Sequence, residues 1–147
     1  MWGERKRCND FRGPRYCLDM NPKRSMSVKS NSHRELIVWQ RAVDLAVEVN
    51  QLSRKLPSDE RFGLALQMRS AAVSIASNIA EGKGRYQRKD FARFLSIARG
   101  SSRELDTHFV IAERSKYLRA HDIAAAESAL DEVGRMLTAL LRRLTPL

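Results

Sequence analysis

Hydrophobic residues recur at intervals of three and four positions in four long segments of the chain, which is the spacing of an amphipathic helix. The last segment shows the pattern most clearly, in an unbroken series: Ile123, Ala126, Leu130, Val133, Leu137, Leu140 and Leu144. The four predicted helices run from His33 or Glu35 to Lys55 and then over residues 59–81, 87–117 and 120–144. Four such helices with short links predict an all-α fold, an antiparallel up-down-up-down four-helix bundle.

Residues with known roles at helix ends mark the predicted boundaries. Ser32 is a suitable N-cap for the first helix, and Glu35 stands three positions later, where it would complete a capping box. Pro57 ends this helix because proline has no amide hydrogen to donate and restricts the residue before it. Gly82 is expected to end the second helix in a left-handed C-cap, since glycine adopts positive φ without a Cβ clash.

The chain divides into an N-terminal tail, residues 1–32, and the bundle domain, residues 33–147. The tail has no apolar periodicity and is rich in Arg, Lys, Asn, Ser, Gly and Pro, so we expect it to be disordered or loosely attached. It also carries much of the net charge of +10, because residues 1–34 hold nine Lys or Arg and only three Asp or Glu. The bundle itself is therefore only mildly basic.

Several classes of protein are excluded by composition. No apolar run approaches the ~18 residues of a membrane span, and no apolar segment follows the basic N-terminus as in a secretory signal. The two cysteines, Cys8 and Cys17, both lie in the tail, which argues against a disulfide framework and indicates a cytoplasmic protein. The three histidines are scattered without neighbouring metal-ligand residues. We expect no catalytic residues, metal ion or cofactor.

Basic residues cluster where the second helix passes into the third. Seven Lys or Arg lie between positions 83 and 103, against one acid, Asp90. Such a cluster is typical of a phosphate-binding surface, and an exposed tyrosine within it can stack on an unpaired base. An ordinary solvated face, ion-paired to acids of other helices such as Asp131 or Glu132, is the alternative. The residues predicted to contact nucleic acid are Lys83, Arg85, Tyr86, Arg88, Lys89 and Arg93.

Polar residues also occur on the faces that the second and third helices are predicted to bury. Glu104 and Arg69 fall at similar depth in the two antiparallel helices, and a half-buried carboxylate needs a partner to offset its desolvation. We therefore expect either an Arg69–Glu104 pair or a network centred on Asn78, with Glu81 at the turn. Either arrangement is structural rather than catalytic.

Three stretches resemble a known bacterial family of four-helix-bundle proteins, first noticed as products of intervening sequences within 23S ribosomal RNA genes. They are VWQRAVDLAVEV (38–49), FGLALQMRSAAVSIASNIAEGKGR (62–85) and FARFLSIARGSSRELDT (91–107). SIASNIAEG followed by GSSREL is the most specific combination. The likeness extends over about residues 34–144 and leaves the tail outside it.

This resemblance implies a homopentameric ring. It also implies similarity to the accessory proteins of diversity-generating retroelements, which bind nucleic acid and a reverse transcriptase. The sequence as a whole favours a non-enzymatic, oligomeric protein that associates with RNA or DNA. The alternative is a protein-binding scaffold, for a reverse-transcriptase-like partner, without direct contact to nucleic acid.

Overall fold

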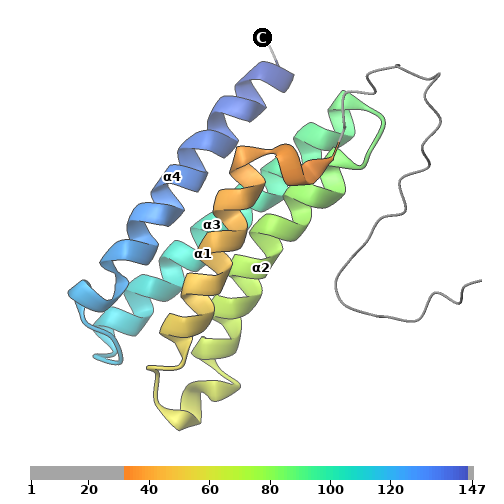
Figure 1. Cartoon of the computed structure of the whole chain (residues 1–147). Helices are drawn as coiled ribbons and strands as arrows, with labels where there is room; N and C mark the ends of the chain where they lie inside the picture. Colours follow the sequence, from red (N-terminus) through yellow and green to blue (C-terminus); the bar gives the residue numbers. More distant parts are fainter. Residues whose placement is uncertain (1–31, 146–147) are drawn as a thin grey trace, which may run out of the picture.

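A computed structural model describes residues 32–145. All regular secondary structure in this part of the chain is helical, with no β-strand. Figure 1 shows four helices side by side, with consecutive helices running in opposite directions. Their bounds are Ile37–Ser53 for α1, Leu64–Lys83 for α2, Arg88–Arg114 for α3 and Ala120–Leu144 for α4. The all-α prediction is confirmed. The prediction for the tail lies outside the described residues, apart from Ser32.

The apolar stripes of the four helices meet in one continuous core. Its largest members include Leu45, Met68, Leu105, Phe109 and Leu137, all essentially inaccessible to solvent. In α2 the buried side chains at positions 71, 72 and 76 are alanines, which lets neighbouring helices pack closely against it. Burial of these apolar surfaces is the main source of the bundle's stability.

Two helices begin later than the sequence pattern predicts. Ser32 does cap the chain, accepting a hydrogen bond from the Arg34 amide at 3.2 Å, but it caps a short 3₁₀ turn (η1, His33–Glu35) instead of α1. A second 3₁₀ turn (η2, Ser58–Arg61) precedes α2. There Glu60 accepts a hydrogen bond from the Leu64 amide at 2.8 Å, and its carboxylate occupies the space that a Cβ on Gly63 would need.

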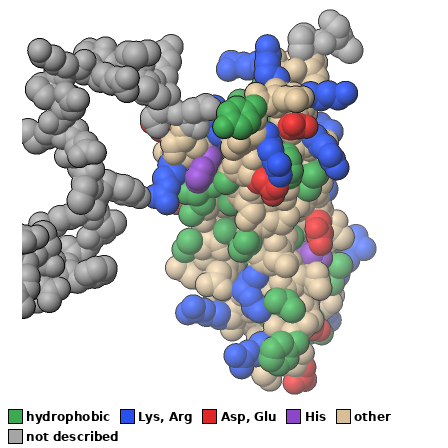
Figure 2. Space-filling view, turned by 90° about the vertical axis from the view of Figure 1, so that its right-hand side faces the viewer, with side chains coloured by type: hydrophobic (Ala, Val, Ile, Leu, Met, Phe, Trp, Pro, Cys, Tyr) green, Lys and Arg blue, Asp and Glu red, His purple; other side chains and the backbone are tan. Residues whose placement is uncertain are grey.

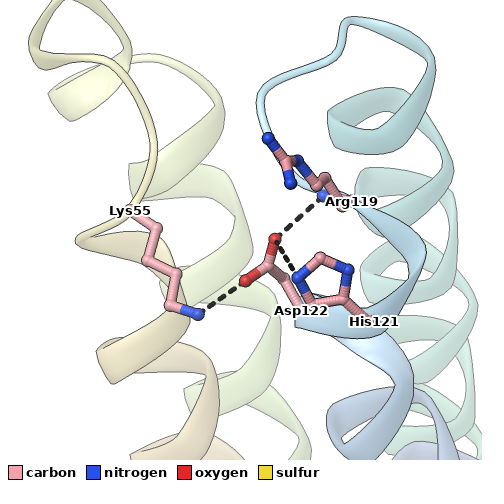
Figure 3. Close-up of polar contacts among 4 residues, drawn as sticks. All are labelled: Lys55, Arg119, His121 and Asp122. Atoms are coloured by element: carbon pink, nitrogen blue, oxygen red, sulfur yellow. Dashed lines mark hydrogen bonds and ion pairs between the residues drawn. The ribbon is translucent and has the colours of Figure 1, made fainter.

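One acidic side chain fastens the start of α4 to the end of α1 (Figure 3). Asp122 accepts a hydrogen bond from the Arg119 amide at 3.1 Å and pairs with the Lys55 ammonium at 2.7 Å. His121 Nε2 lies 3.8 Å from the same carboxylate. The hydrogen bond from Lys55, aided by that from Arg119, lowers the pKa of Asp122 below the ordinary aspartate value. The link joins helices that are distant in sequence at one end of the bundle.

Candidate nucleic-acid interface

Gly82 lies where α2 and α3 pack together beside the predicted interface, but it does not end α2 as predicted. It lies inside α2, buried, and a Cβ there would stand 2.6 Å from Phe94 Cβ and 3.0 Å from Phe91 Cδ2 on α3. The helix ends two residues later, with Gly84 as the C-cap in a right-handed conformation, φ −73°. The predicted left-handed C-cap at Gly82 is therefore wrong. The glycine is needed for the close approach of two helices and not for a turn.

Lys83 and Arg85, two of the six predicted nucleic-acid contacts, lie against aromatic rings of α3. Lys83 Nζ lies 5.9 Å from the centre of the Phe91 ring, and the Arg85 guanidinium lies 5.1 Å from that of Phe94, as in cation–π contacts. Arg85 also forms an ion pair with Glu81 one helical turn earlier. These contacts hold both cations against the surface where α2 and α3 meet.

Lys89 and Arg93 point to the opposite side of α3, where they line an open hollow between α3 and α4 of about 560 Å³. Arg99 from α3 and Arg142 from α4 complete its charged lining, which includes no carboxylate from residues 32–145. Small side chains such as Ala92 and Ser96 leave the space open. Four like charges in one concave surface produce a strong local attraction for anions.

A second hollow, of about 400 Å³, continues along the same seam and shares Thr138 and Arg142 with the first. Arg103 and Arg135 line it together with two acids, Asp106 and Asp131. Positive charge is thus concentrated at the end nearer the start of α3 and diluted toward the middle of the bundle. We call the two hollows the basic groove; its cations are Lys89, Arg93, Arg99, Arg103, Arg135 and Arg142.

The arginines of α4 were missed by the sequence prediction, which considered only the segment around the turn. Arg135 and Arg142 are seven residues apart, two helical turns, and so lie on one side of α4. That spacing was the available signal. The position of Arg142 beside Lys89 and Arg93, and that of Arg135 beside Arg103, follow only from the packing of α4 on α3.

The acids proposed as alternative partners of the turn cluster are engaged elsewhere. Asp131 lies 4.0 Å from Arg135 within α4, and Glu132 pairs with Arg41 of α1 at 3.4 Å. Neither forms an ion pair with a predicted nucleic-acid contact among the described residues.

Neither Tyr86 nor Arg88 lines the two hollows of the basic groove. Tyr86 is fully exposed in the turn between α2 and α3, with its ring open to solvent. The Arg88 guanidinium donates a hydrogen bond to the carbonyl oxygen of Arg143 at 3.1 Å, which ties the start of α3 to the end of α4. Arg88 therefore helps to shape the groove, whereas Tyr86 is available to a ligand.

The predicted polar network forms around Asn78 and not between Arg69 and Glu104. Asn78 donates hydrogen bonds to the carbonyl and hydroxyl oxygens of Ser74, and the Ser74 hydroxyl lies 2.8 Å from that of Ser101 on α3. Glu104 is exposed to solvent, so no buried partner is required. The expected Arg69–Glu104 pair is absent among the described residues because the Arg69 side chain turns to the opposite side of α2, toward Ser53 of α1.

A third hollow differs from the basic groove in being apolar. It lies between α1 and α2, measures about 510 Å³ and is lined mainly by hydrophobic side chains, including Trp39, Val43, Val47 and Val73. The two valines at positions 47 and 73 are 54% and 56% exposed, which is high for side chains with no polar atoms. Figure 2 shows hydrophobic side chains open to solvent on one face of the bundle, with several Lys and Arg side chains around its upper end.

Within residues 32–145, no group of three or more His, Cys, Asp or Glu is placed to hold a metal ion. The helices of this part of the chain are also too short or too polar to cross a membrane.

Comparison with known proteins agrees with this architecture. The family model described as 23S rRNA-intervening sequence protein matches residues 34–139. The chain is also similar to a crystal structure of a protein with unknown function from the S23 ribosomal protein family of Bacteroides thetaiotaomicron VPI-5482. The TM-score is 0.68 at 21% identity, over 72% of this chain and 99% of that one, which shows a shared fold. No match is found among curated proteins. The bundle therefore belongs to the family of 23S rRNA-intervening sequence proteins.

Proposed function

We propose that this protein is a non-enzymatic, oligomeric nucleic-acid-binding protein whose basic groove contacts the phosphate backbone of RNA or DNA. The observation that carries the proposal is the hollow between α3 and α4, whose charged lining in the described part of the chain consists of Lys89, Arg93, Arg99 and Arg142. Phosphate contacts supply most of the affinity in non-specific nucleic-acid binding, and they need little more than correctly spaced cations. Tyr86, fully exposed in the turn between α2 and α3, supplies a ring for stacking on a base.

Fluorescence anisotropy of the full-length protein with a short labelled RNA tests this function at salt concentrations from about 50 to about 200 mM. Each phosphate contact contributes roughly 0.7 to 0.9 to the slope of log affinity against log salt. Replacing Lys89 and Arg93 by Gln should therefore weaken binding and make the slope shallower by roughly 1.5. Arg88 is left unchanged because it contacts α4.

The matched control is the double substitution Arg114→Gln and Lys116→Gln, which removes the same two kinds of charge at the other end of α3. Both residues are exposed and line neither hollow of the groove. Equal loss of affinity in the two variants would indicate a response to net charge alone and would exclude the groove. Absence of salt-sensitive binding in the unaltered protein would refute the function itself.

A second candidate function, a protein-binding scaffold, is favoured by the apolar hollow between α1 and α2. An exposed apolar surface of this kind is typical of a protein–protein contact. A second copy of the chain, as in the homopentamer that the family resemblance implies, and a reverse-transcriptase-like protein are the two partners considered. Val47→Asp combined with Val73→Asp should lower the mass measured by light scattering if the hollow mediates self-association, and an unchanged mass would exclude that role.

A further inference from the structure

A separate cluster of arginines lies at the end of the bundle where α1 passes into α2, the end opposite the α2–α3 turn (Figure 1). Arg54, Arg61 and Arg69 line a hollow of about 430 Å³ beneath the loop that contains η2. Polar side chains of Asn50, Ser53 and Ser58 complete much of the lining, and no carboxylate of the described residues takes part. We call this hollow the arginine pocket.

Arg69 is the residue that makes the cluster unusual. Arg69 is half-buried as a residue, and its guanidinium donates hydrogen bonds to the Ser53 hydroxyl at 3.2 Å and to the Arg61 carbonyl oxygen at 3.3 Å. Both acceptors are neutral. A charge withdrawn from water is costly unless an opposite charge compensates it. Within residues 32–145 none of the pocket's three arginines has a carboxylate within ion-pair distance.

The nearest acids in the sequence, Asp59 and Glu60 of η2, do not supply that compensation. Neither lines the pocket. The Glu60 carboxylate is taken up by the Leu64 amide, and through hydrogen bonding and its charge it raises the pKa of the Tyr117 hydroxyl. It is thus directed toward α2's first turn and Tyr117. Apart from the three arginines, the described residues that line the pocket are all neutral.

Arg61 is held at the rim by its own neighbour. Its guanidinium lies 5.5 Å from the centre of the exposed Phe62 ring. Arg54 is exposed at the end of α1 and makes no side-chain hydrogen bond within the described part of the chain. One guanidinium is therefore fixed by hydrogen bonds, one is steadied by an aromatic ring, and one is available to close over a ligand.

We propose that the arginine pocket is a binding site for a phosphate group, either the free ion or a phosphate monoester. Planar guanidinium groups match phosphate oxygens in bidentate geometry, and a monoester offers three acceptor oxygens and a charge of about −1.5 to −2 at neutral pH. The Ser53 and Ser58 hydroxyls provide further donors. The pocket falls within the usual range of roughly 300–1,000 Å³ for small-ligand sites and has room for a group attached to the phosphate. The site is distinct from the basic groove and does not depend on the function proposed for it.

Isothermal titration calorimetry of the full-length protein tests the site with inorganic phosphate, adenosine monophosphate, adenosine and acetate, at equal ionic strength. Inorganic phosphate or adenosine monophosphate should bind saturably at one site per chain, while adenosine and acetate do not. If inorganic phosphate binds more tightly than adenosine monophosphate, the free ion is the preferred ligand. If adenosine monophosphate binds more tightly, the preferred ligand is a phosphate carried by a nucleotide. Acetate binding as tight as that of phosphate would overturn the proposal in favour of a carboxylate site.

Arg54→Gln is the decisive variant because Arg54 is exposed and its loss should leave the fold intact. Binding should weaken at least tenfold in Arg54→Gln and remain unchanged in Arg114→Gln, the matched control. The groove variant with Lys89→Gln and Arg93→Gln should also retain full affinity. Undiminished binding in Arg54→Gln, loss of binding in the groove variant, or absence of phosphate binding by the unaltered protein would each overturn the assignment. If the protein binds phosphate but not RNA, only the nucleic-acid-binding function proposed for the basic groove is refuted.

Discussion

Substituting Gly82 by alanine tests the close approach of α2 and α3 that positions the candidate interface. The added Cβ would lie 2.6 Å from Phe94 Cβ and 3.0 Å from Phe91 Cδ2, whereas carbon atoms in contact normally lie about 3.5–4.0 Å apart. The helices must therefore separate by roughly 1 Å, and such overpacking costs about 1–3 kcal/mol. Alanine returns up to about 1 kcal/mol through its higher helix propensity. The net expectation is a loss of stability.

Gly100 and Gly134 provide internal controls because both are helical and a Cβ there would meet nothing within 4 Å. Alanine at either position should stabilise the protein by about 0.5–1 kcal/mol. The propensity gain is common to all three substitutions, so their difference isolates the steric cost at Gly82. In chemical denaturation Gly82→Ala should be less stable than Gly100→Ala by about 1–3 kcal/mol.

Thermal unfolding followed by circular dichroism gives the same comparison, at about 2–4 °C per kcal/mol for a chain of this size. If Gly82→Ala unfolds at the same temperature as Gly100→Ala, the two helices do not approach as closely as described.

Three further predictions follow from single side chains. Phe109→Ala should lower the free energy of unfolding by about 3–5 kcal/mol, because Phe109 is fully buried in the core; a loss below 1 kcal/mol by urea titration would contradict that burial. The lowered pKa of Asp122 means that its bond to Lys55 stabilises the fold above the ordinary aspartate pKa of about 3.9 and is lost as pH falls toward the folded-state value. The difference in the free energy of unfolding between the unaltered protein and Asp122→Asn should therefore narrow on acidification in that range. A difference independent of pH would contradict a stabilising role for the ionised Asp122 carboxylate. Tyr86→Ala should leave the unfolding temperature unchanged, since the side chain is fully exposed, and weaken RNA binding by about 1–3 kcal/mol if its ring stacks on a base.

The residues of the candidate nucleic-acid interface were only partly predictable from the sequence. The cluster around the turn was evident as a local excess of Lys and Arg, but its members separate in space. Lys83 and Arg85 lie against Phe91 and Phe94, while Lys89 and Arg93 face α4. The turn between α2 and α3 separates Lys83 and Arg85 from Lys89 and Arg93, so proximity in sequence does not determine which charges share a surface.

The sequence by itself determined the helical class and most helix boundaries, because periodic burial and helix-end chemistry are local properties. The predicted fourth helix coincides with Ala120–Leu144, where the apolar series is unbroken. Only the tertiary structure decided which helix flanks meet. Packing of α4 on α3 placed Arg142 beside Arg93, and the reversal between α1 and α2 brought Arg54 and Arg69 into one pocket. Such juxtapositions depend on the rotation of each helix about its axis, which is set by how the whole core packs.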